Sequence, residues 1–254
     1  MNNIGAYTFV VDDFYADQTG TLAWGALGRF LLNCSNSHSM KIGIGMGRYD
    51  NNFYMWVITR LIVNLNEPIN KGQTIKMETW ISKIYHSFIN REYVIMDDDS
   101  KVIGTAFAVW ALIDAKTRQT VNLVNMFGPD LELIVYGETN DLSFDKKRVK
   151  LSSSSEESSS LIVKFGDIDI NQHMNSIRYI EHALDLFPSE LYLHHFLNRI
   201  EVQYGQETSL NDHLTLINHK MDDRSIYVEF RKESEEQACK IRFYFNEYGI
   251  NEEF

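Results

Sequence analysis

The same order of elements occurs twice along this chain: a stretch with helical spacing, followed by several strand-like runs. Apolar residues recur at helical spacing from residue 21 to about 34, and again from 175 to 187. An amphipathic helix must bury its apolar face, and the strand-like runs provide a sheet to bury it against. One helix followed by several long antiparallel strands is typical of an α+β fold. We therefore expect a duplicated architecture, a helix wrapped by a curved sheet, twice.

The strand-like runs differ in how fully they are covered. In VIGTAFAVWALI, residues 102–113, nearly every residue is apolar, as expected of a central strand covered on both faces. The DDDS sequence at 97–100 precedes it and predicts a hairpin turn. The expected strands are residues 7–11, 55–64, 74–84, 91–96, 102–113, 200–204, 213–219, 226–231 and 238–245.

A serine-rich segment, LSSSSEESSS at 151–160, separates the two halves. Serine adds little to a core and competes for backbone hydrogen bonds, so this segment predicts a flexible connection. It follows a basic run of Lys146, Lys147, Arg148 and Lys150. We expect an N-terminal domain at 1–145, a linker at 146–160 and a C-terminal domain at 161–254.

Composition excludes several classes of protein. The chain has 254 residues, of which 44% are hydrophobic, and a net charge of -11. A hydrophobic fraction of this size excludes a disordered chain, and the acidic balance argues against binding nucleic acid or an anionic membrane surface. Two distant cysteines, Cys34 and Cys239, argue against a disulfide framework or a cysteine-built zinc site.

The N-terminal residues do not resemble a targeting segment. Asp12 and Asp13 fall where a signal peptide would need an apolar run. No stretch approaches the ~18 uninterrupted apolar residues of a membrane span. We therefore expect a cytoplasmic protein with no membrane contact.

Polar side chains suited to catalysis cluster directly before the second helix. Asp169, Asn171 and His173 are two residues apart, so an extended segment would point all three to one side and Ile170 and Gln172 away. The free N–H groups of the helix that follows lie close by. These are the groups needed for general base catalysis and for stabilising an oxyanion.

A simpler alternative is that the Asp and Asn cap the helix and that the histidine lies on the surface. An alternation of Asp and His can also bind a cation, but no further ligand has suitable spacing. We therefore expect neither a metal ion nor a cofactor.

The segment from residue 167 to 185, DIDINQHMNSIRYIEHALD, resembles a motif of the acyl-acyl-carrier-protein thioesterases of plant plastids and bacteria, D-[LI]-D-x-N-x-H-x-N-[NS]-x-[KR]-Y-I-[EG]. The first half agrees independently. WVITR at 56–60 resembles that family's W-V-[VL]-[TS]-R, and TW at 79–80 its T-W-[VI]. AVW at 108–110 and KTR at 116–118 resemble further family sequences. The resemblance covers nearly the whole chain, with the motifs in the family's order.

The resemblance implies two tandem hotdog domains, each a long helix cradled by an antiparallel sheet. It implies hydrolysis of the thioester that joins a fatty acyl chain to the phosphopantetheine arm of acyl carrier protein (ACP), in fatty acid biosynthesis. In that family the active site lies in the C-terminal hotdog. Its Asp, Asn and His fall on Asp169, Asn171 and His173, and its Glu, in a Y-x-x-E pattern, falls on Glu207. On spacing alone, that Glu is a solvated strand carboxylate.

One departure from the family bears on the chemistry. Plant members place Cys directly after this Glu, whereas this chain has Thr208. Neither Cys34 nor Cys239 lies near a motif residue in the sequence. The reaction is therefore expected to use a carboxylate and water, or a carboxylate nucleophile.

The resemblance suggests a role for each site residue. Glu207 or Asp169 would deprotonate or orient the water. Asn171 and nearby backbone N–H groups would hold the oxyanion, and His173 would polarise the water or protonate the leaving thiolate.

The acyl chain requires an apolar slot, which the resemblance places in the N-terminal hotdog. The candidates for its lining are Trp24, Leu27, Leu31, Trp56 and Ile58. The alternative is that these side chains are ordinary core.

Acidic carrier proteins would be repelled by an acidic chain, so docking would need a local basic patch. Arg178 and Arg199, close in sequence to the catalytic segment, form one candidate patch. The cluster from Lys146 to Lys150 is another, with a solvated linker flank as its alternative.

Other readings remain open. One is an acyl-CoA thioesterase or a hydroxyacyl dehydratase of the same superfamily, and another is a non-catalytic acyl-binding protein. The dehydratase is a poorer match because His38 and His86 are isolated in the first half. Either a monomer or a homodimer is compatible with the sequence.

Overall fold

The computed structural model describes residues 3–49, 52–143, 156–222 and 224–247. In the first half, a long helix follows one strand and precedes the others. The elements are β1 (Gly5–Val10), α1 (Trp24–Lys41), β2 (Gly47–Tyr49), β3 (Asn52–Leu65), β4 (Thr74–Ile84), β5 (Phe88–Met96), β6 (Val102–Asp114), α2 (Leu123–Phe127) and the 3-10 helix η1 (Pro129–Ile134).

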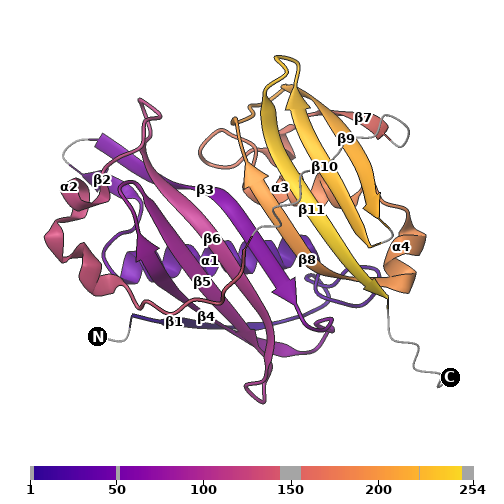
Figure 1. Ribbon diagram of the computed structural model, residues 1–254, viewed down its shortest axis with the longest axis horizontal. Helices are drawn as coiled ribbons and strands as arrows, with labels where there is room; N and C mark the ends of the chain where they lie inside the picture. The colour runs from indigo at the N-terminus through magenta and orange to yellow at the C-terminus, as the bar shows by residue number, and fades with distance from the viewer. Residues whose placement is uncertain (1–2, 50–51, 144–155, 223, 248–254) are drawn as a thin grey trace.

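The second half repeats this order with a shorter helix. Its elements are β7 (Glu156–Ile162), the 3-10 helix η2 (Phe165–Asp167), α3 (Ser176–Leu184), α4 (Ser189–His194), β8 (His195–Tyr204), β9 (His213–Asp222), β10 (Ser225–Lys232) and β11 (Gln237–Glu247). Figure 1 shows α1 behind the strands of the first half and α3 behind those of the second. The α+β prediction is confirmed, and each half is a helix laid against an antiparallel sheet, the hotdog arrangement.

The described strands form one continuous sheet. Its order is β1-β4-β5-β6-β3-β8-β11-β10-β9-β7, and β2 pairs with β3 at the side. The halves join where β3 pairs antiparallel with β8, from Arg60 opposite Gln203 to Asn64 opposite Arg199. Main-chain hydrogen bonds therefore connect the two hotdogs directly.

The two helices also meet across the halves. Gly25 and Gly28 of α1 leave room for α3, because a Cβ at Gly28 would lie 2.6 Å from Cδ1 of Ile177 and one at Gly25 would lie 2.0 Å from Oε1 of Glu181. Buried residues of both halves form one hydrophobic cluster around this contact. The helices therefore share a core rather than each covering a separate one.

Two expectations about elements need correction. The predicted linker at 146–160 is a strand in its last five residues, because β7 pairs with β9 from Glu156 to Ile162. An edge strand needs main-chain partners more than apolar side chains, so its serines do not prevent pairing. Residues 144–155, with the basic run from Lys146 to Lys150, lie outside the described residues. The second helix ends at Leu184, and α4 follows Pro188 as a separate turn.

Candidate active site

A tight turn between η2 and α3 holds three of the predicted site residues. The turn is closed by a bridge between Ile168 and Met174 and by a hydrogen bond from the N–H of Asp169 to the carbonyl of His173 (2.9 Å). Gln172 has a φ of 65°, in the left-handed region. The segment is therefore a tight turn and not an extended run of residues.

The side chains nevertheless divide as expected. Asp169, Asn171 and His173 all line one cavity, whereas Ile170 is 94% exposed. The carboxylate of Asp169 accepts a hydrogen bond from the backbone N–H of Asn171 at 2.7 Å. This contact orders the turn from within and uses one oxygen of Asp169.

Hydrogen bonds to neighbouring segments hold this turn in place. Asn175 caps α3, because its side chain accepts from the N–H of Ile177 at 2.9 Å. The N–H of Asn175 donates to the carbonyl of Asp167, and the N–H of Met174 donates to the carbonyl of Thr208 (both 2.8 Å). This last bond ties the turn to the segment that carries Glu207.

Glu207 lies in the loop after β8 and reaches the same cavity. Its Oε2 lies 3.5 Å from Nε2 of His173, and its other oxygen is paired with the guanidinium of Arg118. The side chain of Lys232 donates to the backbone carbonyl of Glu207 at 3.0 Å, which fixes the loop. Thr208, where plant relatives would have Cys, shares a hydrogen bond with the hydroxyl of Tyr179 (2.7 Å).

Arg118 comes from the first half of the chain and was missed as a site residue. It lies in the turn after β6, at the end of the KTR sequence that we noted only as part of the resemblance. The sequence indicates only that a turn begins at Asp114. In the structure, the carboxylate of Asp114 accepts hydrogen bonds from the N–H groups of Lys116 (2.9 Å) and Thr117 (2.8 Å). A contact across 89 sequence positions cannot be read from that turn alone.

The electrostatic environment keeps His173 neutral. Burial lowers the pKa of its imidazole, the positive charge of Arg118 lowers this pKa further, and Asp169 opposes both. With a pKa below the usual 6.5, the imidazole carries no charge near neutral pH. A neutral imidazole can accept or relay a proton, as general acid–base catalysis requires.

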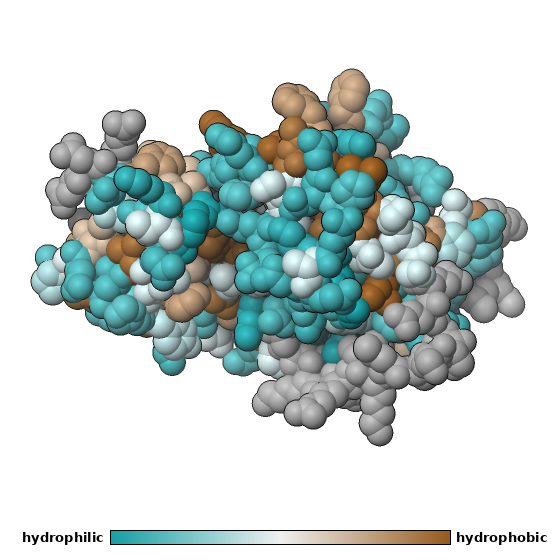
Figure 2. Space-filling view, turned by 90° about the horizontal axis from the view of Figure 1, so that it is seen from above, coloured by the Kyte–Doolittle hydropathy of each residue, from teal (hydrophilic) through white to brown (hydrophobic). Residues whose placement is uncertain are grey.

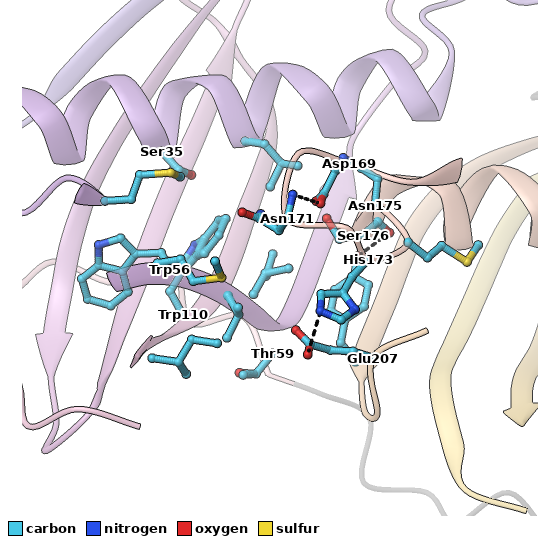
Figure 3. Close-up of a pocket in the computed structure, with 18 of the residues that line it drawn as sticks. Ser35, Trp56, Thr59, Trp110, Asp169, Asn171, His173, Asn175, Ser176 and Glu207 are labelled. Carbon is cyan, nitrogen blue, oxygen red and sulfur yellow. Dashed lines mark hydrogen bonds and ion pairs between the residues drawn. The ribbon is translucent and has the colours of Figure 1, made fainter. Parts of the chain in front are cut away.

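The cavity has a volume of about 500 Å³ and is lined by both halves. Figure 3 shows His173 and Glu207 facing each other at one end, with Trp56, Trp110 and Ser35 along the part that leads away from them. The apolar lining includes Leu32 of α1, Trp56 and Ile58 of β3, Ile89 of β5 and Trp110 of β6. Of the predicted acyl-chain residues, Trp56 and Ile58 therefore line the cavity.

The other three predicted lining residues are core. Trp24, Leu27 and Leu31 are between 1% and 9% exposed, belong to the main hydrophobic cluster, and do not line the cavity. The reason is geometric: successive residues of a helix point about 100° apart. The fully apolar face of α1 lies in the core, so Leu32 and Ser35 face the cavity instead.

The cavity also has a polar region that the sequence did not indicate. Arg91 of β5 is 1% exposed and lines the cavity with Ser39 of α1. Its guanidinium donates to Nδ1 of His38 (2.8 Å), to Ser39 (2.8 Å) and to Thr79 (3.3 Å). Within the described residues, no carboxylate forms an ion pair with Arg91.

The two arginines predicted to dock a carrier are already paired. Arg178 lies 2.9 Å from Asp167 and 2.5 Å from Glu181, and Arg199 lies 2.8 Å from Glu201. Their charges are balanced inside the protein, which argues against both as a docking patch. Burial would raise the pKa of Asp167, but the N–H of Lys164, His182 and Arg178 together hold it below its usual value.

The cysteines offer no nucleophile to the site. Cys239 is opposite Tyr204 in the β11–β8 register, closer to a motif residue than we expected, but it is fully buried and does not line the cavity. Burial raises its pKa well above the usual value and raises that of Cys34 to about 12. Both therefore remain protonated thiols.

One face of the molecule has a mixed surface. Seen from above, hydrophilic side chains cover most of this face, with hydrophobic ones in separate patches (Figure 2). Phe165 of η2 and Ile170 of the turn between η2 and α3 are 87% and 94% exposed. Over the described ranges, no group of three or more His, Cys, Asp or Glu residues could hold a metal ion, and no helix is long and apolar enough to cross a membrane.

The two halves of the chain match the two domain models of one protein family. The family model of the acyl-ACP thioesterase N-terminal domain matches residues 6–127, and that of the acyl-ACP thioesterase C-terminal domain matches residues 151–247. This chain belongs to the acyl-ACP thioesterase family. The two hotdogs described above are the two domains of that family.

Solved structures of this family have the same fold. The chain is 34% identical to an acyl-ACP thioesterase from Bacteroides thetaiotaomicron, with a TM-score of 0.83 over 96% of this chain and 98% of that one. A 12:0-ACP thioesterase from Umbellularia californica is 15% identical, with a TM-score of 0.84 over 98% of this chain and 99% of that one.

The curated relatives are longer. A chloroplastic acyl-[acyl-carrier-protein] hydrolase from Cuphea viscosissima is 27% identical over 180 residues, which are 68% of this chain and 44% of the relative. The match therefore spans less than half the length of that relative.

Proposed function

We propose that this protein hydrolyses the thioester of fatty acyl-ACP and releases a free fatty acid. The observation that carries the proposal is the pairing of His173 with Glu207 (3.5 Å) at one end of a cavity whose apolar lining comes mainly from the first half. A carboxylate and a neutral imidazole beside an apolar slot suit hydrolysis of a bond at the end of an acyl chain. Membership of the acyl-ACP thioesterase family supports ACP as the carrier.

In this proposal Glu207 takes a proton from water as the water oxygen attacks the carbonyl carbon. The side-chain amide of Asn171, which lines the cavity, holds the resulting oxyanion. When the carbon–sulfur bond breaks, the sulfur receives a proton through His173. Asp169 orders the turn that carries Asn171, in keeping with its bond to the N–H of that residue (2.7 Å).

Each half of the chain would have a separate role in the reaction. The N-terminal domain, proposed as residues 1–145, would bind the acyl chain through Trp56 and Ile58. The C-terminal domain, predicted to begin at 161 and extended to Glu156 because β7 pairs with β9, would carry the catalytic groups. Because one chain lines the whole cavity, a monomer would be sufficient to form the site.

The test is hydrolysis of matched acyl-ACP and acyl-CoA thioesters by wild type and by His173→Ala, Glu207→Gln and Asn171→Ala. We expect kcat to fall about 10²- to 10⁴-fold in the first two and about 10²- to 10³-fold in the third. His194→Ala and Glu190→Gln, both exposed on α4, serve as matched controls and keep wild-type rates.

Each other outcome has a clear meaning. Equal rates on acyl-CoA would reject ACP as the specific carrier. No hydrolysis of any thioester by wild type, with retained fatty-acid binding, would reject the enzyme and leave an acyl-binding protein.

A further inference from the structure

The guanidinium of Arg118 brings a positive charge from the first half of the chain to the catalytic carboxylate of the second. One terminal nitrogen is paired with Oε1 of Glu207, and the other lies 3.3 Å from the sulfur of Met55. The remaining oxygen of Glu207, Oε2, is the one that lies 3.5 Å from His173. The arginine thus occupies one side of the carboxylate and leaves the other to the imidazole.

Backbone hydrogen bonds fix the conformation of the turn that carries Arg118. Its N–H donates to the carbonyl of Asp114 (2.9 Å), and the N–H of Asp114 donates to the carbonyl of Gln119 (3.0 Å). A bridge between Ile113 and Thr120 closes the turn at its base. Arg118 has a φ of 59°, a left-handed conformation that costs a non-glycine residue about 1 kcal/mol or more. The surrounding hydrogen bonds maintain this conformation, which directs the side chain toward the second half.

Several charged groups surround His173, and Arg118 has the strongest effect among them. They are Arg118 from the β6–α2 turn, Glu207 from the β8–β9 loop, Asp169 from its own turn, Lys232 from β10 and Asp212 from the segment before β9. Lys232 acts on the imidazole in the same direction as Arg118, and Asp169 acts against both. The arginine is the one of these groups that the first half supplies.

We propose that Arg118 is a positioning residue that directs Glu207 at His173 and places its positive charge beside both side chains, so that the N-terminal half completes the catalytic site of the C-terminal half. A carboxylate that removes a proton from water must be ionised, and an adjacent guanidinium favours that form. The proposal rests on the proposed function for its effect on turnover but not for its effect on the imidazole.

Turnover is tested with Arg118→Met and Arg118→Lys, measuring kcat and kcat/KM for acyl-ACP across pH. Arg118→Met is expected to lower kcat about 10²-fold. Loss of the positive charge raises the pKa of His173, so the acid limb of the profile moves to higher pH. Compared with Arg118→Met, Arg118→Lys is expected to return the acid limb to its wild-type pH and to recover part of kcat. Lysine carries the positive charge but lacks the planar guanidinium that donates two parallel hydrogen bonds to a carboxylate.

Arg29→Met is the matched control. Arg29 also pairs with a glutamate of the other half, Glu181 at 2.6 Å, but it does not line the cavity. This control is expected to keep the wild-type profile. An unchanged acid limb in Arg118→Met, or the same loss of kcat in Arg29→Met, would overturn the proposal.

A second measurement is independent of catalysis. The imidazole of His173 is titrated by NMR in wild type and in Arg118→Met without substrate, and its pKa is expected to rise in the variant. If wild type hydrolyses no thioester, the proposed function fails while this titration still decides the role of Arg118. An unchanged His173 pKa would overturn that role.

Discussion

The contact between Arg91 and His38 fixes the charge of a buried histidine. Because a guanidinium only donates hydrogen bonds, Nδ1 of His38 must accept from Arg91 at 2.8 Å, which requires a neutral imidazole. His38 is 1% exposed. Burial lowers its pKa from 6.5 to about 4, and the charge of Arg91 acts in the same direction.

This low pKa predicts a loss of stability in mild acid. Unfolded chains bind the proton near pH 6.5, whereas the native state binds it only near pH 4. The contribution of neutral His38 is therefore fully present above pH 6.5 and is lost as the pH falls toward 4. The free energy of unfolding should fall by about 2 kcal/mol from this residue between pH 7 and pH 4.5.

Urea unfolding of wild type and His38→Gln at both pH values measures this contribution. Glutamine can accept the hydrogen bond from Arg91 without titrating, so the variant should lose about 2 kcal/mol less than wild type over that interval. An equal loss in the two proteins would show that His38 does not contribute.

Among individual residues, the sequence predicted only those site residues that lie close together in the chain. Asp169, Asn171 and His173 were predicted to face one way, and they do, although the backbone is a turn closed by Gln172 in the left-handed region. Arg118 and Arg91 were not predicted as site residues. Each depends on a contact more than 50 positions away, which no local pattern encodes.

Among the elements, the end of β8 against β11 controls where Glu207 lies. Gly205 and Gln206 follow β8 and donate to the carbonyls of Ala238 (2.8 Å) and Gln237 (3.0 Å). A Cβ on Gly205 would lie 2.2 Å from the Gln237 backbone oxygen, which cannot move aside as a side chain can. The close approach of the two backbones therefore requires glycine.

Gly205→Ala should push the loop away from β11. We expect a loss of about 1–3 kcal/mol in unfolding free energy, because the extra methyl overpacks this contact. We also expect kcat to fall about 10²-fold, because a displacement of about 1 Å of a catalytic group can lower the rate by about that factor. The two quantities are measured by urea unfolding and by acyl-ACP hydrolysis.

The matched control is Gly166→Ala in η2, where a Cβ would meet nothing within 4 Å. It should change neither quantity. Wild-type stability and rate in Gly205→Ala would contradict the role assigned to this contact.

The apolar runs predicted most of the sheet. The run at 74–84 corresponds to β4, and those at 55–64 and 102–113 differ from β3 and β6 by a few terminal residues. The exceptions are the short β2, Gly47–Tyr49, and β7, whose EESSSLI sequence has neither the alternation nor the apolar content of a strand. The strand β7 forms because β9 offers a free edge, and this depends on the tertiary fold rather than on local sequence.

In the whole molecule, the two hotdogs are joined more tightly than a pair of linked domains. A row of register partners crosses the junction, from Phe243 of β11 to Ile200 of β8, then to Val63 of β3 and Ala106 of β6. All four are at most 1% exposed and belong to the same hydrophobic cluster, together with residues of α1 and α3. Burial on one side of the junction therefore depends on packing on the other.

Such continuity predicts that the halves unfold together. Phe243→Ala removes a fully buried ring that contacts Phe187 edge to face, at a cost of about 3–5 kcal/mol. Hydrogen exchange should then accelerate in α1 and β3 as well as in β11, and urea should produce one transition. Phe165→Ala, at an 87% exposed position, should change neither measurement. Faster exchange confined to the second half, with two separate transitions, would mean that each hotdog is an independent folding unit and that the β3–β8 pairing joins them only after both have formed.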